Sequence, residues 1–194
     1  MFIRLMNRSI LASFCFAGFL AVVSAHAQVV PAATSRTFSV SAGAFGSMFQ
    51  PDYADLGVAQ TSPNRLYGPG VYVDVHFSRW LQVEGEGRWL RYNQYYLHGL
   101  PPGNGENTYL IGPRIPIVTF HRVTPYGKFL VGLGNGPFLG GNALVLAYGG
   151  GVDYRLTRRF TLRAVDFEYQ QWLVNSSTTL WPYGGSVGIS YKIF

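Results

Sequence analysis

The chain has 194 residues, of which 12% are charged, 48% hydrophobic and 16% aromatic. Soluble domains usually carry about 25% charged residues, so this composition argues against an ordinary soluble fold and favours one with an apolar exterior. The formal net charge is +6, but no cluster of Lys and Arg with interleaved aromatic residues accompanies it. The charge therefore does not indicate nucleic-acid binding.

The N-terminus has the three parts of a secretory signal peptide. Arg4 and Arg8 form the basic region, residues 10–23 form an apolar run, and Ala-His-Ala at residues 25–27 is a cleavage site. The run is short for a membrane-spanning helix, although an uncleaved anchor is the alternative. We therefore expect residues 1–27 to be removed during export through the Sec pathway.

The remaining chain is expected to form one domain. Residues 28–36 are small and polar and predict a short leader, and residues 37–194 predict the folded domain. The single cysteine, Cys15, lies in the signal peptide. The mature chain is therefore expected to have no disulfide and no thiolate site.

After the leader, segments of alternating hydrophobicity recur eight times, which is the pattern of half-buried strands. The expected strands cover residues 37–45, 71–77, 81–91, 108–115, 125–133, 144–154, 160–170 and, after a loop over 171–180, the end of the chain. The clearest hairpin joins the second and third strands through the turn at residues 78–80.

The connections between these segments alternate in expected length. Those after the second, fourth and sixth strands are short, and the others are longer and richer in Gly, Pro and Asn, as at residues 46–69 and 134–142. Short periplasmic turns and long external loops are typical of an up-and-down membrane barrel. The loop over residues 46–69 is the expected main contact surface.

The end of the chain alternates strictly between apolar and polar residues. One face carries Val187, Ile189, Tyr191 and Ile193, and the other carries Ser186, Gly188, Ser190 and Lys192. The spacing of Gly188, Tyr191, Ile193 and Phe194 resembles the C-terminal signal that the bacterial barrel-assembly machinery reads. A soluble sandwich strand is the alternative, and a soluble lipocalin-like barrel would need an apolar interior instead.

Over essentially the whole mature chain, these features resemble the eight-stranded OmpA/OmpX-type outer-membrane β-barrel superfamily, barrel domain only. The resemblance implies an all-β, antiparallel, up-and-down transmembrane barrel in the bacterial outer membrane. It implies a monomer whose partners are membrane lipid, lipopolysaccharide, the assembly machinery and an external ligand of the loops.

An eight-stranded barrel has an interior just wide enough for side chains to fill. Alternation predicts an inward charge network of Asp74, Glu84, Glu86, Arg88, Arg114, Lys128, Asp153 and Lys192. The hairpin should place Asp74 beside Glu84, and two adjacent carboxylates need cationic partners. We interpret the network as a structural core, with a narrow channel for ions or small solutes as the alternative. Simple alternation puts Arg163 opposite Asp166 and Glu168, so it lies either at the rim or beside a bulge.

The sequence offers no catalytic or metal site, and no cofactor is expected. His76 is predicted inward, His98 in an external loop and His121 in a periplasmic turn, and no two share metal-ligand spacing. A lipid A-modifying barrel enzyme using His98 is a further alternative, but no Ser-His-acid arrangement accompanies it. Aromatic girdles are expected at both membrane surfaces, with Trp80 and Phe160 near the periplasmic one and Trp172 near the external one.

Overall fold

The computed structural model describes residues 38–52, 65–78, 80–92, 105–136, 139–174 and 178–194. The expected signal peptide, leader and His98 lie outside these residues. The described parts consist of strands and their connections, and no helix among them could cross a membrane.

The described residues form ten strands. They are β1 (Ser39–Gln50), β2 (Leu66–His76), β3 (Gln82–Trp89), β4 (Arg91–Tyr92), β5 (Asn107–Pro116), β6 (Val123–Asn135), β7 (Asn142–Arg155), β8 (Phe160–Leu173), β9 (Thr179–Leu180) and β10 (Tyr183–Lys192). The two-residue strands β4 and β9 pair with β2 and β8, respectively, so eight long strands form the body of the fold.

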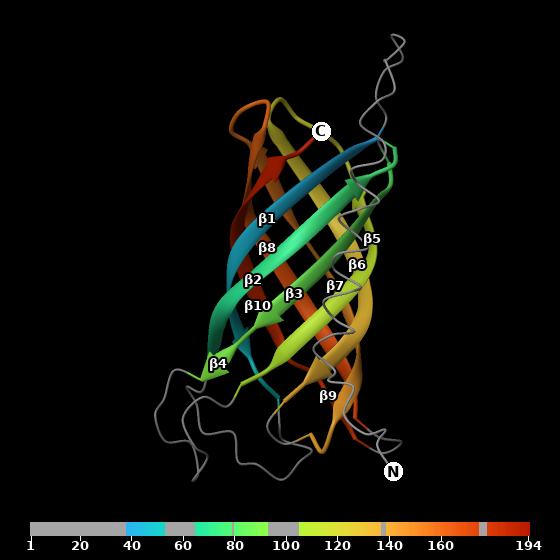
Figure 1. Ribbon diagram of the computed structural model, residues 1–194, viewed down its shortest axis with the longest axis vertical. Coiled ribbons are helices and arrows are strands. Elements are labelled where there is room, and N and C mark those ends of the chain that lie inside the picture. The colour runs from blue at the N-terminus through green and yellow to red at the C-terminus, as the bar shows by residue number, and fades with distance from the viewer. Residues whose placement is uncertain (1–37, 53–64, 79, 93–104, 137–138, 175–177) are drawn as a thin grey trace, which may run out of the picture. The chain divides into compact units, whose positions relative to one another are not determined.

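These eight strands close into an antiparallel barrel, visible as tilted ribbons in Figure 1. The order around the sheet is β1, β10, β8, β7, β6, β5, β3, β2, and β1 also pairs with β2. Closure gives every strand two neighbours and leaves no free edge, as a strand in lipid requires. The predicted all-β, eight-stranded up-and-down barrel is confirmed.

The strands extend further than the sequence predicts at one end. β1 continues to Gln50 and β2 begins at Leu66, so both ends of the loop expected at residues 46–69 belong to strands. The cause is cross-strand pairing. Gly46 pairs with Pro69 in the β1–β2 ladder, although Gly and Pro are usual turn residues.

The two ends of the barrel differ. The turn end carries residues 77, 78, 80, 81, 117–122 and 156–159 and the C-terminus, whereas the loop end carries β4, β9, the end of β1 and the start of β2 (Figure 1). Side chains close two of the turns. The Ser78 hydroxyl accepts a hydrogen bond from the Leu81 amide at 3.0 Å, and the Thr157 hydroxyl accepts one from the Phe160 amide at 3.0 Å.

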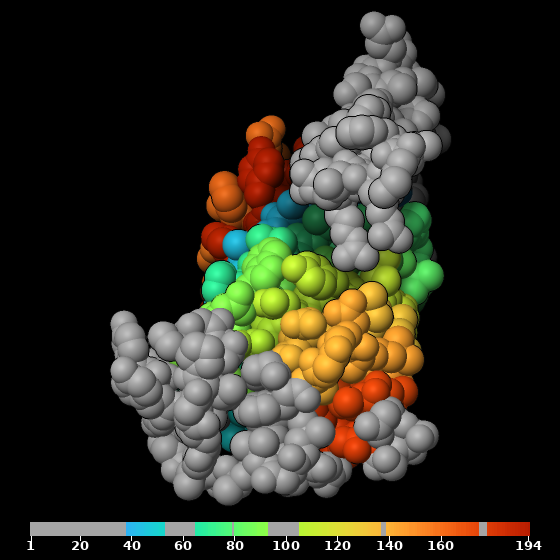
Figure 2. Space-filling view, turned by 60° about the horizontal axis from the view of Figure 1, so that its bottom comes forward, coloured from blue at the N-terminus to red at the C-terminus, as the bar shows by residue number. Residues whose placement is uncertain are grey.

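The barrel is polar inside and apolar outside. On β3, Gln82, Glu84, Glu86 and Arg88 are all buried. Outward side chains are apolar and exposed, as for Ile111 on β5 at 58% and Val187 on β10 at 55%. On the face drawn in Figure 2, the coloured atoms of successive parts of the chain lie directly against one another. A polar interior with an apolar exterior is the reverse of a soluble barrel and matches a barrel surrounded by lipid.

Toward the loop end the interior becomes apolar. One buried cluster joins Leu110, Leu130, Ala143, Val145, Ala147, Trp172 and Leu180, and a second joins Phe49, Leu66 and Leu90. The prediction that Trp172 belongs to an interfacial girdle is therefore wrong, because this side chain is 1% exposed. Trp80 and Phe160, at the turn end, are exposed as predicted.

Candidate functional site: the charged lumen

A network of buried ion pairs fills the middle of the barrel. Among the described residues it joins six carboxylates to four cations. The acids are Asp74 (β2), Glu84 and Glu86 (β3), Asp153 (β7), and Asp166 and Glu168 (β8); the cations are Arg88 (β3), Arg114 (β5), Lys128 (β6) and Arg163 (β8). Six of the eight long strands therefore contribute charged side chains to the network.

Lys128 lies at the centre of this network. Its Nζ is 2.7 Å from Asp166 Oδ2, 2.9 Å from Glu168 Oε2, 3.1 Å from Glu84 Oε1 and 3.3 Å from Glu86 Oε2. Its side chain is fully buried. An ammonium withdrawn from water needs such compensation, and here one cation neutralises parts of four carboxylates.

Arg88 connects β3 to β8 across the barrel. Its two terminal nitrogens donate to the two carboxylate oxygens of Glu168 at 2.8 and 3.0 Å, which is a bidentate pair. The guanidinium also lies 3.0 Å from Glu86 and 4.4 Å from the ring centre of Phe49. Three strands separate β3 from β8 in either direction around the sheet, so this pair spans the full diameter.

Arg163 makes a second diametric contact. Its Nη2 donates to Glu84 Oε2 at 2.6 Å, and its guanidinium stacks 3.7 Å from the ring centre of Tyr72. It reaches the lumen because β8 carries a bulge. The pairing with β7 passes from Val152–Val165 directly to Asp153–Arg163, which skips Ala164. Of the two positions that the sequence left open for Arg163, the structure has the one beside a bulge.

Arg114 anchors the turn-end side of the network. It donates to Asp153 Oδ2 at 2.6 Å and to Gln82 Oε1 at 2.8 Å, and it stacks 3.6 Å from the ring centre of Tyr126. The Asp153 side chain remains 18% exposed. Arg88, Arg114 and Arg163 thus each combine carboxylate contacts with an aromatic ring, which fixes the plane of the guanidinium.

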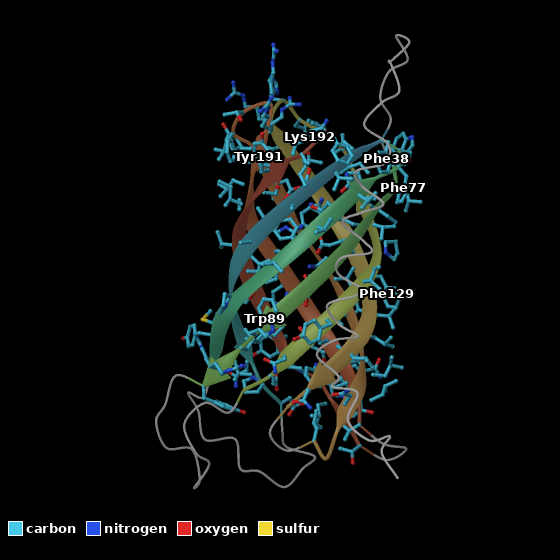
Figure 3. The ribbon with its side chains drawn as sticks, in the orientation of Figure 1. Phe38, Phe77, Trp89, Phe129, Tyr191 and Lys192 are labelled. Carbon is cyan, nitrogen blue, oxygen red and sulfur yellow. The ribbon has the colours of Figure 1, made fainter. Side chains whose placement is uncertain are left out.

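Seven of the eight predicted lumen residues enter this network, and Lys192 does not. The β2–β3 register places Asp74 opposite Glu84, as the predicted hairpin implies. Lys192 follows the inward alternation of β10 but is the last residue of that strand, so it lies exposed at the rim (Figure 3). The prediction for Lys192 therefore needs correction.

The predicted network omitted three of its members, Arg163, Asp166 and Glu168. All three are buried and bridge to other strands. Alternation within residues 166–170 could have identified the two acids, because both share a face with Gln170. Arg163 could not be assigned in the same way, because the bulge breaks the alternation.

Glu84, Glu86 and Asp166 offer oxygens close enough together to suggest a metal site. The Lys128 ammonium, however, lies 2.7–3.3 Å from each of these residues. A metal ion would compete with this cation for the same oxygens. The six acids and four cations carry a formal charge of −2, so the network is a paired core with a small acidic excess.

The residues of the expected assembly signal lie at the closing strand. Tyr191 and Ile193 lie on the outward face and are 37% and 53% exposed, and Phe194, beyond the end of β10, is 44% exposed. Gly188 lies on the inner face close to Phe45. The Phe194 ring stacks on Phe38 at 6.1 Å, next to the β1–β10 pairing that closes the barrel. Recognition of these residues by the assembly machinery stays a prediction.

Comparison with solved structures finds similar proteins of low sequence identity. Neisserial surface protein A is 20% identical, with 81% of this chain and 97% of that chain covered and a TM-score of 0.49. Ail of Yersinia pestis, solved with the heparin analogue sucrose octasulfate, is 19% identical, with 80% and 97% covered and a TM-score of 0.49.

The N-terminal β-barrel domain of Pseudomonas aeruginosa OprF is 14% identical, with 80% and 97% covered and a TM-score of 0.48. No curated protein matches the chain. A family model, described as the outer membrane protein beta-barrel domain, matches residues 15–192. This match covers most of the sequence and agrees with the closed, apolar-faced barrel, and the chain belongs to that outer-membrane barrel family.

Proposed function

We propose that this protein is a non-enzymatic surface barrel. Its lumen is a closed structural core, and its loop end contacts molecules outside the cell. The observation that carries the first part is the pair of diametric contacts, Arg88–Glu168 and Arg163–Glu84, both between β3 and β8. A side-chain bridge from wall to wall blocks an aqueous path, unlike the open lumen of a large porin.

The apolar clusters support the same proposal. They lie in the lumen toward the loop end, on one side of the charged network, and Trp172 links the two. Its Nε1 donates to Gln170 Oε1 at 2.8 Å, and Gln170 Nε2 donates to Glu168 Oε1 at 2.8 Å. An ion crossing the barrel would therefore have to pass an apolar layer and break charge pairs, and both steps are costly.

Conductance tests the closed lumen. The full chain is expressed in bacteria, purified from outer membranes and inserted into planar bilayers, with heat-dependent mobility on gels verifying the folded barrel. We expect no steady conductance. Conductance in the wild type that disappears in the double variant Glu84→Gln, Glu86→Gln would establish the narrow-channel reading instead.

The surface role rests on the asymmetry of the two ends. The loop end carries the longer connections, and long external loops with short periplasmic turns are the rule in this architecture. The proposed partners are lipid and lipopolysaccharide around the barrel, the assembly machinery at the C-terminal strand and a ligand at the loops, with the barrel itself a monomer.

Trypsin treatment of intact cells tests the orientation. Arg65, at the loop end, and Arg158, at the turn end, are both exposed. We expect cleavage at Arg65 in intact cells and cleavage at Arg158 only after lysis. The reverse order would place the loops in the periplasm and remove the surface role.

A further inference from the structure

The turn end carries a basic cavity that the lumen network does not use. It is lined by Arg122, Arg155, Leu156, Thr157 and Arg158 and has a volume of about 480 Å³. Arg122 comes from the turn between β5 and β6, and the other residues come from the end of β7 and the turn before β8. Two adjacent turns therefore form the site.

Hydrogen bonds from Arg155 hold these turns together. The Arg155 amide donates to the Arg122 carbonyl at 2.8 Å, and Arg155 Nη2 donates to the His121 carbonyl at 3.3 Å. His121 has a φ of 55° in a two-residue turn closed by paired hydrogen bonds of 2.9 Å between Phe120 and Val123. Two-residue hairpin turns require a positive φ, so these hydrogen bonds and this conformation fix the position of the neighbouring Arg122.

The cavity has an excess of positive charge. Within the part of the chain that the structure describes, neither Arg122 nor Arg158 has a side-chain ion pair or hydrogen bond, and both are exposed. Residues 117–122 and 155–160 contain no acid. The acid that precedes Arg155 by two residues, Asp153, pairs with Arg114 in the lumen. Guanidinium groups in this situation favour a phosphate, which they can bind through two parallel hydrogen bonds.

Apolar side chains lie beside this charge. Leu156 lines the cavity and is 40% exposed, and Phe120, in the first of these turns, and Phe160, which follows the second, are 64% and 43% exposed. Figure 3 shows Phe38, Phe77 and Tyr191 at this end of the barrel, so it lies at the level where aromatic girdles meet headgroups. A ligand that contacts both the arginines and the apolar side chains needs an anionic phosphate attached to acyl chains.

We propose that this cavity binds the headgroup phosphate of an anionic phospholipid, with Arg122 and Arg158 as the phosphate ligands and Leu156 against the acyl chains. The site would fix one lipid of the leaflet at the turn end. It does not depend on whether the lumen conducts or on what the loops bind.

Native mass spectrometry tests the site on the protein purified from membranes in detergent. The probes are phosphatidylglycerol, phosphatidylcholine and inorganic phosphate. We expect one tightly bound phosphatidylglycerol, weaker phosphatidylcholine binding and no displacement of the lipid by excess inorganic phosphate. Loss of one charge-assisted contact in Arg158→Gln or Arg122→Gln should weaken phosphatidylglycerol binding about tenfold.

Arg159→Gln is the matched control, because it makes the same charge change in the same turn. Arg159 does not line the cavity, and its guanidinium donates to the Tyr191 hydroxyl at 2.9 Å. Equal weakening by Arg158→Gln and Arg159→Gln would mean a diffuse positive field and would overturn the site. Equal binding of both lipids, or displacement by inorganic phosphate, would overturn the anionic-phospholipid assignment.

Discussion

Replacing Lys128 by methionine removes the central charge of the lumen while preserving most of the side-chain volume. Four carboxylate oxygens lie within 3.3 Å of Nζ. At an effective dielectric constant of about 20, one unit-charge pair about 3 Å apart is worth about 5.5 kcal/mol before desolvation. Removing one partner of a buried ion pair typically costs about 3–5 kcal/mol. Because Lys128 contacts four carboxylates, we expect Lys128→Met to lower the free energy of unfolding by about 4–5 kcal/mol, near the upper end of this range.

The matched control is Lys192→Met, which makes the same substitution at the exposed rim. It should change stability by no more than about 0.5 kcal/mol, because Lys192 makes none of the ion pairs found among the described residues. The assay is urea unfolding of the barrel in lipid vesicles, followed by tryptophan fluorescence and by the heat-dependent mobility shift.

Two outcomes decide this prediction. A difference of about 4 kcal/mol between the variants would support a network that depends on Lys128, and adding Asp166→Asn to Lys128→Met should restore part of the loss. Equal stability of Lys128→Met and Lys192→Met would refute the reasoning. It would mean that water or proton uptake compensates the carboxylates.

Two backbone predictions follow. A Cβ at Gly43 would lie 2.6 Å from the Tyr72 ring, so Gly43→Ala should lower the free energy of unfolding by about 1–3 kcal/mol. A Cβ at Gly46 would meet open space, so Gly46→Ala should change it by no more than about 0.5 kcal/mol. Equal effects of the two substitutions in urea unfolding would contradict the packing at the inner face. Deleting Ala164 should remove only the bulge, leave Arg163 facing inward and preserve the heat-dependent mobility shift. Deleting Val131 from the regular strand β6 should abolish the shift, because it moves the following side chains to the opposite face. Loss of the folded barrel in both cases would show that the bulge is required.

The sequence predicts the barrel well because period-two alternation reports directly which side of a strand faces lipid. Each long strand contains or overlaps one predicted segment, and the inward residues of β3 follow the pattern without exception. The predicted positions of the strand ends are less accurate. Gly46 and Pro69 favour turns locally, but in the barrel they pair with one another because β1 and β2 continue beyond the predicted boundary.

Contacts across the lumen could not be predicted from the pattern. Alternation says that Glu84 and Lys128 face inward, but strand tilt and stagger decide which inward residues meet. Trp172 shows the same limit. Its inward position follows from sharing a face with Gln170, yet a Trp near a strand end also fits an interfacial girdle. Only the neighbouring strands distinguish the two, through the apolar cluster that buries it.

The bulge on β8 can be understood by comparing costs. In a regular strand, Arg163 would face lipid if Asp166 faced the lumen. An arginine on the lipid face costs about 2–4 kcal/mol at the midplane and less near the surface. Glu84 would also lose its 2.6 Å partner, at a cost of about 3–5 kcal/mol for a buried pair. The bulge avoids both costs by turning Ala164 and Val165 outward together, and both are exposed. Two successive apolar residues between a cation and an acid are therefore the local signal that alternation should break here.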